Sequence, residues 1–162
     1  MTNYSHPTRK SPRLQGYDYS QDGMYFITIC AFRRWHVFGR VFADCMVLNR
    51  AGEIASEAWI NLPRLFPQIE IDVYVVMPNH MHGIIRVNQD VNPRYPLGFY
   101  ISQYKAAVTR RVHQERVFRD SHLWQRRFHD HIIRSEDAIH KIREYIIHNP
   151  AQWQADSLYS ES

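Results

Sequence analysis

Two apolar segments joined by a three-residue turn constrain the fold of this chain more than any other feature. Ile69–Val76 alternates and then becomes fully apolar, and His80–Val87 has apolar residues around two histidines. The residues between them, Met77, Pro78 and Asn79, are typical of a turn. Segments of this length and composition predict strands. So short a connection predicts that the two strands pair as an antiparallel hairpin.

The second strand of this hairpin carries His80 and His82, one residue apart. Side chains alternate between the faces of a strand, so both imidazoles project from one face, roughly 7 Å apart along the strand. Two imidazoles placed in this way can converge on one divalent cation, which favours a metal-dependent enzyme. The chain has 10 histidines, so a chance pair packed in the core is the alternative. His129 and His131 form a second such pair, without the preceding turn.

The composition indicates a basic domain that is rich in aromatic residues. A chain of 162 residues predicts one domain, and 44% apolar and 22% charged residues are ordinary for a globular protein. The aromatic share of 14% is high, and the net charge is +4. Cations for phosphates and rings for unpaired bases favour a nucleic-acid partner. The alternative is a basic protein with no such partner.

The cysteines and the apolar runs exclude several classes of protein. Cys30 and Cys45 stand far apart, so we expect free thiols and no structural zinc knuckle. No apolar run approaches the roughly 18–20 residues of a membrane span. Residues 1–7 lack the apolar segment of a signal peptide. We therefore expect a cytoplasmic protein without a membrane partner.

The order of predicted elements indicates a fold class. Besides the hairpin, we expect a strand at 24–32, a short extended piece at 42–48, helices at 49–65 and 97–117, extended structure at 123–133, and a final helix from Ser135 to His148 that Asn149-Pro150 ends. Strands and helices in this order predict an α+β, ferredoxin-like fold with a mainly antiparallel sheet. We divide the chain into a basic N-terminal arm (1–20), a catalytic domain (21–150) and a C-terminal tail (151–162) that Trp153 anchors.

Two groups of basic residues are candidates for contact with DNA or RNA. One group lies in the N-terminal arm and the other on the predicted helix at 97–117. A solvated tail and a solvated helix face are the alternatives. The candidates are Arg9, Lys10, Arg13, Lys105, Arg110 and Arg111.

The final helix offers further chemistry. Tyr145 and Asn149 are four residues apart, so they share one face of the helix. Asn149 carries an oxygen suited to a hard cation, and the Tyr145 phenol could attack phosphorus. The alternatives are core packing for Tyr145 and a helix end for Asn149. Tyr104, on the basic helix, is a rival nucleophile without a metal-binding neighbour.

Several segments, in order and spacing, resemble the HUH single-tyrosine transposases, in particular the REP-associated tyrosine transposases. The resemblance extends from about residue 9 to residue 153. The segments that carry it are Arg13-Leu14-Gln15-Gly16-Tyr17-Asp18-Tyr19, Tyr25-Phe26-Ile27-Thr28-Ile29-Cys30, Met77-Pro78-Asn79-His80-Met81-His82, Tyr104-Lys105-Ala106-Ala107-Val108-Thr109, Leu123-Trp124-Gln125-Arg126-Arg127-Phe128, His131-Ile132-Ile133-Arg134 and Tyr145-Ile146-Ile147-His148-Asn149-Pro150.

This resemblance implies a site and a reaction. It implies that His80, His82 and Asn149 bind Mg²⁺ or Mn²⁺, although imidazole also suits Zn²⁺. It implies that Tyr145 is the nucleophile and forms a covalent 5′-phosphotyrosine link with single-stranded or hairpin DNA. Either a monomer or a homodimer is compatible with the family.

Two other functions fit the same residues. A non-catalytic module could bind hairpin DNA or RNA on the same fold. A metal-dependent phosphodiesterase could use water as the nucleophile, with Tyr145 packed in the core.

Overall fold

A four-stranded antiparallel sheet forms the centre of the molecule, which we describe from a computed structural model over residues 22–88 and 90–160. Its strands lie in the order β4 (Ile69–Val76), β5 (His80–Val87), β1 (Gly23–Cys30) and β6 (His129–Ile133). Each strand runs antiparallel to its neighbours. With one helical crossover after β1 and another after β5, this is the ferredoxin-like arrangement. The predicted fold class is confirmed.

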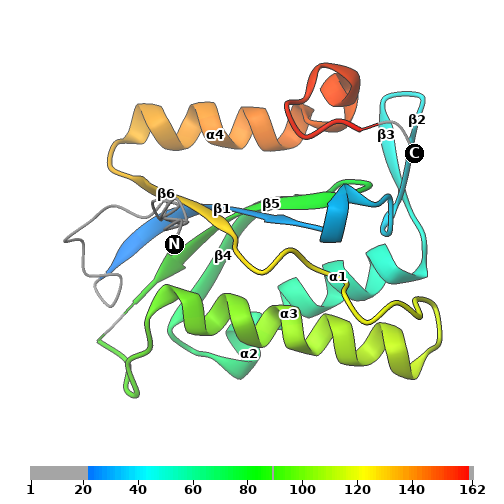
Figure 1. Cartoon of the computed structure of the whole chain (residues 1–162). Coiled ribbons are helices and arrows are strands. Elements are labelled where there is room, and N and C mark those ends of the chain that lie inside the picture. Colours follow the sequence, from blue (N-terminus) through cyan, green and yellow to red (C-terminus); the bar gives the residue numbers. More distant parts are fainter. Residues whose placement is uncertain (1–21, 89, 161–162) are drawn as a thin grey trace, which may run out of the picture.

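Helices cover both faces of the sheet, which gives three layers (Figure 1). Helices α1 (Arg50–Ile60), α2 (Leu62–Leu65) and α3 (Leu97–Gln114) lie on one face, and α4 (Glu136–His148) lies on the other. The remaining elements are the hairpin of β2 (Gly39–Phe42) and β3 (Cys45–Leu48) and the 3₁₀ helices η1 (Phe32–Arg34) and η2 (Pro150–Ala155).

Local sequence explains where the helices begin. The Asn49 side chain accepts a hydrogen bond from the Gly52 N–H at 3.0 Å and caps α1. Ser135 caps α4 in the same way, with 3.2 Å between its hydroxyl and the Ala138 N–H. The helix expected at 49–65 is interrupted at Asn61, one residue before the α2 segment that contains Pro63.

Two other segments differ from the prediction. The extended piece expected at 42–48 is not one strand but the turn and second strand of the β2–β3 hairpin. Ala43 and Asp44 both adopt positive φ and form the tight turn between the two strands. Of the extended segment 123–133, only β6 is a strand of the sheet, although Trp124 forms an isolated bridge with Ala31.

The main core lies between the sheet and α1 and α3. On β5 the side chains of Met81 and Ile85 face this core, together with Gly83. A Cβ atom at Gly83 would lie 2.6 Å from the Trp59 ring of α1, so glycine allows this close approach of helix and strand.

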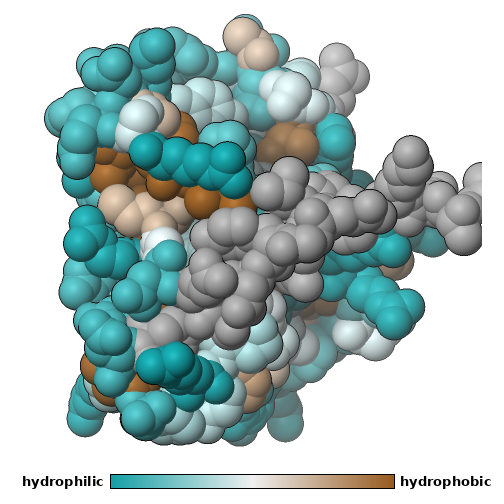
Figure 2. All heavy atoms as spheres, turned by 90° about the vertical axis from the view of Figure 1, so that its left-hand side faces the viewer, coloured by the Kyte–Doolittle hydropathy of each residue, from teal (hydrophilic) through white to brown (hydrophobic). Residues whose placement is uncertain are grey.

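A smaller core lies between the sheet and α4. Ile84 of β5, Ile133 of β6, and Ile139 and Ile146 of α4 are buried there. At the end of the molecule seen in Figure 2, hydrophobic surface shows between the level of α4 and that of the sheet. Since side chains alternate along β5, His80 and His82 share the face of Ile84 and lie towards α4.

Some expectations concern residues outside the described ranges. The arm at 1–20, with Arg9, Lys10 and Arg13, lies there, so its contact with DNA stays a prediction.

Cys30 and Cys45 are free thiols, as expected. Within residues 22–88 and 90–160, no helix combines the length and the apolar composition that crossing a membrane requires.

Candidate metal and tyrosine site

His80 and His82 lie side by side at the start of β5, beneath α4. Their Nε2 atoms are 3.1 Å apart. Both side chains are buried, with 0% and 2% of their residue surface exposed. The Phe26 ring of β1 stacks on His82, with 5.1 Å between ring centroids. The predicted convergence of the two imidazoles is therefore present in the structure.

A second hydrogen bond orients each imidazole. His80 Nδ1 lies 2.7 Å from Asn79 Oδ1, an atom that can only accept, so Nδ1 donates and Nε2 carries a lone pair. Asn79 is itself held by donating from Nδ2 to Leu158 O and Ser160 Oγ. His82 Nδ1 lies 2.8 Å from Thr28 Oγ1. Partners of this kind on the far ring nitrogen are usual for metal-binding histidines.

Tyr145 reaches the same place from α4. Its Oη lies 3.2 Å from His82 Nε2, and its ring meets Phe26 edge-on with 6.0 Å between centroids. The residue is 38% exposed, so a substrate can reach it. Tyr104, the rival nucleophile, is buried in the main core and donates to Ala55 O at 3.2 Å. Burial also raises the pKa of Tyr104 well above 10, and it keeps a substrate away from the Tyr104 hydroxyl.

Asn149 lies one turn after Tyr145 and points to the same cluster. Its Nδ2 donates to Asp156 Oδ2 at 2.7 Å. Its Oδ1 is buried and accepts no hydrogen bond from any residue that the structure describes. An unsatisfied buried acceptor costs about 1–3 kcal/mol. A cation or a substrate hydroxyl at this oxygen would remove that cost.

Asp156, just beyond η2, is a member of the cluster that the sequence analysis missed. Its Oδ2 accepts from Tyr145 Oη at 3.3 Å and lies 4.0 Å from His80 Nε2. Its side chain is 1% exposed. Among the described residues, potential ligand atoms of His80, His82 and Asp156 all lie within 4.8 Å of one another.

The electrostatics of the cluster favour the charge states of a metal site. Burial lowers the pKa of His80 to about 4 and that of His82 to about 3, so both rings are neutral at pH 7. Burial opposes ionisation of Asp156, but hydrogen bonds from Leu158 N–H and Asn149 outweigh it and lower the pKa of the carboxyl. Burial and the Asp156 carboxylate raise the pKa of Tyr145 to about 12. Neutral imidazoles beside a carboxylate are the forms that bind cations.

The donor set also fits a divalent cation sterically. The two Nε2 atoms lie 3.1 Å apart, and ligand atoms of His80, His82 and Asp156 all lie within 4.8 Å of one another, so these groups could share one ion. Two imidazole nitrogens, a carboxylate and an unpartnered amide oxygen form a mixed set. Such a set suits Mn²⁺ and tolerates Mg²⁺ or Zn²⁺.

The basic residues of α3 lie on the other face of the sheet from Tyr145 (Figure 1). Lys105 donates to the carbonyls of Gln125 and Arg126, and Arg111 pairs with Glu57 and Glu115. Arg110 is exposed. The prediction that these residues bind DNA stays a prediction, and two of the three already have partners within the protein.

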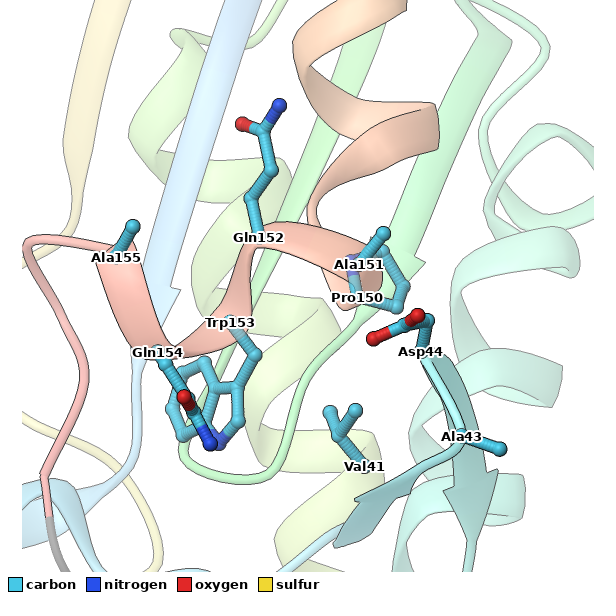
Figure 3. A pocket seen from close by; sticks show the side chains of 9 residues that line it. All are labelled: Val41, Ala43, Asp44, Pro150, Ala151, Gln152, Trp153, Gln154 and Ala155. Atoms are coloured by element: carbon cyan, nitrogen blue, oxygen red, sulfur yellow. The ribbon is translucent and has the colours of Figure 1, made fainter.

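A cavity of about 460 Å³ lies between the β2–β3 hairpin and η2 (Figure 3). Val41 and Asp44 line it from the hairpin, and Pro150 and Trp153 line it from η2. The Trp153 ring also packs against His80, with 5.9 Å between centroids. The η2 segment therefore separates this cavity from the histidine cluster and helps to enclose both.

Comparison with known proteins identifies the family. The family described as "Transposase IS200 like" matches residues 52–149, more than half of the chain. The chain belongs to the IS200-like transposase family. The resemblance to single-tyrosine transposases that the motifs indicated is thereby confirmed.

Two sequence relatives and one solved structure are similar to this transposase. An uncharacterized protein of Haemophilus influenzae is 37% identical over 93% of both chains. A second protein of that organism, named putative REP-associated tyrosine transposase, is 24% identical over 83% of this chain and 74% of its own length. A solved REP-associated tyrosine transposase bound to a REP hairpin superposes with a TM-score of 0.61. That alignment has 23% identity and covers 94% of this chain and 74% of the other, and it supports the fold.

Proposed function

We propose that this transposase cleaves and rejoins single-stranded or hairpin DNA through a covalent link between Tyr145 and a 5′-phosphate, with Mg²⁺ or Mn²⁺ as cofactor. One observation carries the proposal: the Tyr145 Oη lies 3.2 Å from His82 Nε2, at the edge of a buried cluster of metal-binding groups. A phenol packed in the core would not combine partial exposure with this neighbour.

Four residues would hold the cation. His80 and His82 offer Nε2 atoms, Asp156 offers a carboxylate oxygen, and Asn149 offers an amide oxygen that has no other partner among the described residues. When bound, a divalent cation supplies Lewis-acid polarisation of the scissile phosphate and favours the ionised phenol. The sequence-based ligand set of His80, His82 and Asn149 is kept in this proposal, and Asp156 is added to it.

The chain's own residues position the nucleophile and handle its proton. The Tyr145 hydroxyl lies between His82 Nε2 and Asp156 Oδ2, at 3.2 and 3.3 Å, so Asp156 accepts its hydrogen bond. When Oη attacks phosphorus, a bond from Oη to phosphorus forms and the bond from phosphorus to the 3′ oxygen breaks. The phenol loses its proton and the departing 3′ oxygen gains one. The phosphotyrosine bond keeps the energy of the phosphodiester, so a 3′-OH can reverse the reaction without a nucleotide cofactor.

One experiment tests the proposal. The full-length protein is incubated with Mn²⁺ and an end-labelled pool of DNA hairpins with single-stranded flanks, and products are separated on a denaturing gel. We expect a covalent protein–DNA adduct that Tyr145→Phe abolishes. Tyr104→Phe is the matched control, because it removes a phenol in the opposite core and should leave the adduct intact.

Other outcomes would identify the alternative functions. A free 5′-phosphate product without adduct, retained in Tyr145→Phe, would indicate a phosphodiesterase that uses water. Salt-sensitive binding without any cleaved product would indicate a binding module. An adduct that persists in Tyr145→Phe would show that another residue is the nucleophile.

A further inference from the structure

The second histidine pair lies on the same side of the sheet as the site. On β6, His129 pairs with Thr28 and His131 pairs with Phe26. On the opposite side of β1, Thr28 pairs with His82. Residues directly opposite each other in an antiparallel pair point to the same face. His129 and His131 therefore lie on the face of His82 and Tyr145, two strands away from His82.

Among the described residues, neither imidazole of this pair has an interaction partner. His129 and His131 are exposed. In the part of the chain that the structure describes, neither ring takes part in a hydrogen bond, an ion pair or a ring contact. His36, His113, His122 and His148, by contrast, each bond to a neighbouring group. The described ranges also place no third ligand beside His129 and His131, so a second cation site is not indicated.

Phe26 connects the pair to the nucleophile. Its ring stacks on His82 and meets Tyr145 edge-on, and the residue is partly exposed. Its cross-strand neighbour on β6 is His131. From Tyr145 towards the edge of the sheet, the surface therefore presents Tyr145, then Phe26, then His131. Planar rings in such a row offer stacking faces to unpaired bases of any sequence.

The arrangement of α4 leaves this row accessible. Among the strands, helix α4 mainly contacts β4 and β5, which lie away from β6, and of β6 only Ile133 is buried in the core beneath it. In the described ranges β6 is an edge strand, so no further strand of the sheet lies beyond it. A DNA strand with its phosphate at Tyr145 can leave over β6, whereas α4 occupies the opposite direction.

We propose that His131, with His129 beside it, forms a platform on which the unpaired base next to the scissile phosphate stacks. This inference rests on the proposed function, because Tyr145 marks the position of that phosphate. The ligand is a nucleobase of single-stranded DNA, and its recognition is by ring stacking rather than by hydrogen bonds to the base edge.

A fluorescent base tests the platform. Hairpin DNA carries 2-aminopurine at each position of its single-stranded flank in turn, and the full chain with Tyr145→Phe is used to prevent cleavage. At one position of 2-aminopurine, we expect the fluorescence of the complex to differ between the Tyr145→Phe protein and the same protein with His131→Ala. With His131→Phe in place of His131→Ala, the fluorescence should match that of the Tyr145→Phe protein. Affinity should fall about tenfold in the first variant and recover in the second, since a phenyl ring also stacks.

The matched control is His140→Ala, which removes another exposed histidine, on α4. It should leave both fluorescence and affinity unchanged. Unchanged fluorescence at every position in His131→Ala would overturn the platform, and so would a failure of His131→Phe to restore it. The adduct assay is independent of both results. A Tyr145 adduct without a fluorescence response would contradict the platform alone, and a fluorescence response without an adduct would contradict the proposed function alone.

Discussion

At the scale of single residues, Asp156 is the group whose charge the cluster depends on. It faces Tyr145, Asn149 and His80, and its carboxylate is almost fully enclosed. Asp156→Asn keeps the shape and removes the charge. We expect the Mn²⁺ concentration for half-maximal adduct formation to rise at least about tenfold, as for other losses at metal sites.

The measurement is adduct yield against Mn²⁺ concentration. Asp44→Asn is the control, because this acidic residue lines the cavity on the other side of η2. An unchanged Mn²⁺ dependence in Asp156→Asn would remove this residue from the ligand set.

The two buried imidazoles also predict how stability depends on pH. Their pKa values are lowered to about 4 and about 3, so the unfolded chain binds protons below pH 6.5 while the folded chain does not. Their contribution to stability is therefore complete above pH 6.5 and is lost as the pH falls towards 4. The loss is about 1.4 kcal/mol per pH unit for each histidine.

Urea unfolding followed by circular dichroism, with chelator present, measures this slope between pH 7 and pH 4.5. We expect a shallower slope for the double variant His80→Gln and His82→Gln. Equal slopes in both proteins would contradict the assignment of the acid sensitivity to this pair.

At the scale of elements, the contact between α1 and β5 permits no extra atom. A methyl group at Gly83 would overlap the Trp59 ring, which is fully buried. We expect Gly83→Ala to lower the free energy of unfolding by about 1–3 kcal/mol, because α1 must move away from the sheet. Urea unfolding measures it. Thr28→Val is the control, because Thr28 lies on the opposite face of the sheet and α1 should stay in place. If Gly83→Ala lowers the free energy of unfolding less than Thr28→Val does, the overlap with Trp59 is not the cause.

The elements also show what the sequence could predict. The hairpin of β4 and β5, the caps of α4 and the shared face of Tyr145 and Asn149 follow from local rules of period and capping, and these expectations agree with the structure. Asp156 could not be found in this way. It lies beyond a 3₁₀ segment that starts at Pro150, so helical spacing no longer relates it to Tyr145. Its place depends on Trp153 packing against His80, a contact between residues 73 positions apart in the sequence.

At the scale of the whole molecule, the proposed nucleophile and the basic helix α3 lie on opposite faces of the sheet (Figure 1). A short single strand at Tyr145 cannot also reach Arg110, whereas a hairpin long enough to pass around the sheet could. For Arg110→Gln with hairpin DNA, we therefore expect the slope of the logarithm of the binding constant against the logarithm of the salt concentration to become shallower by about 0.9. With a short single strand the slope should not change.

Fluorescence anisotropy between low and moderate salt measures both slopes. Arg111→Gln is a poor substitute for this test, because Arg111 is paired with Glu57 and Glu115. An equal decrease with both DNA forms would place α3 beside the reacting strand, and no decrease with either would exclude Arg110 from the interface.

One chain supplies the phenol, both imidazoles, the carboxylate and the amide oxygen of the candidate site. If those groups suffice, cleavage at saturating DNA should be first order in protein. The turnover of each molecule would then stay constant on dilution, whatever complexes the protein forms at higher concentration. A rate that falls with the square of the protein concentration would mean that a second molecule must complete the reaction.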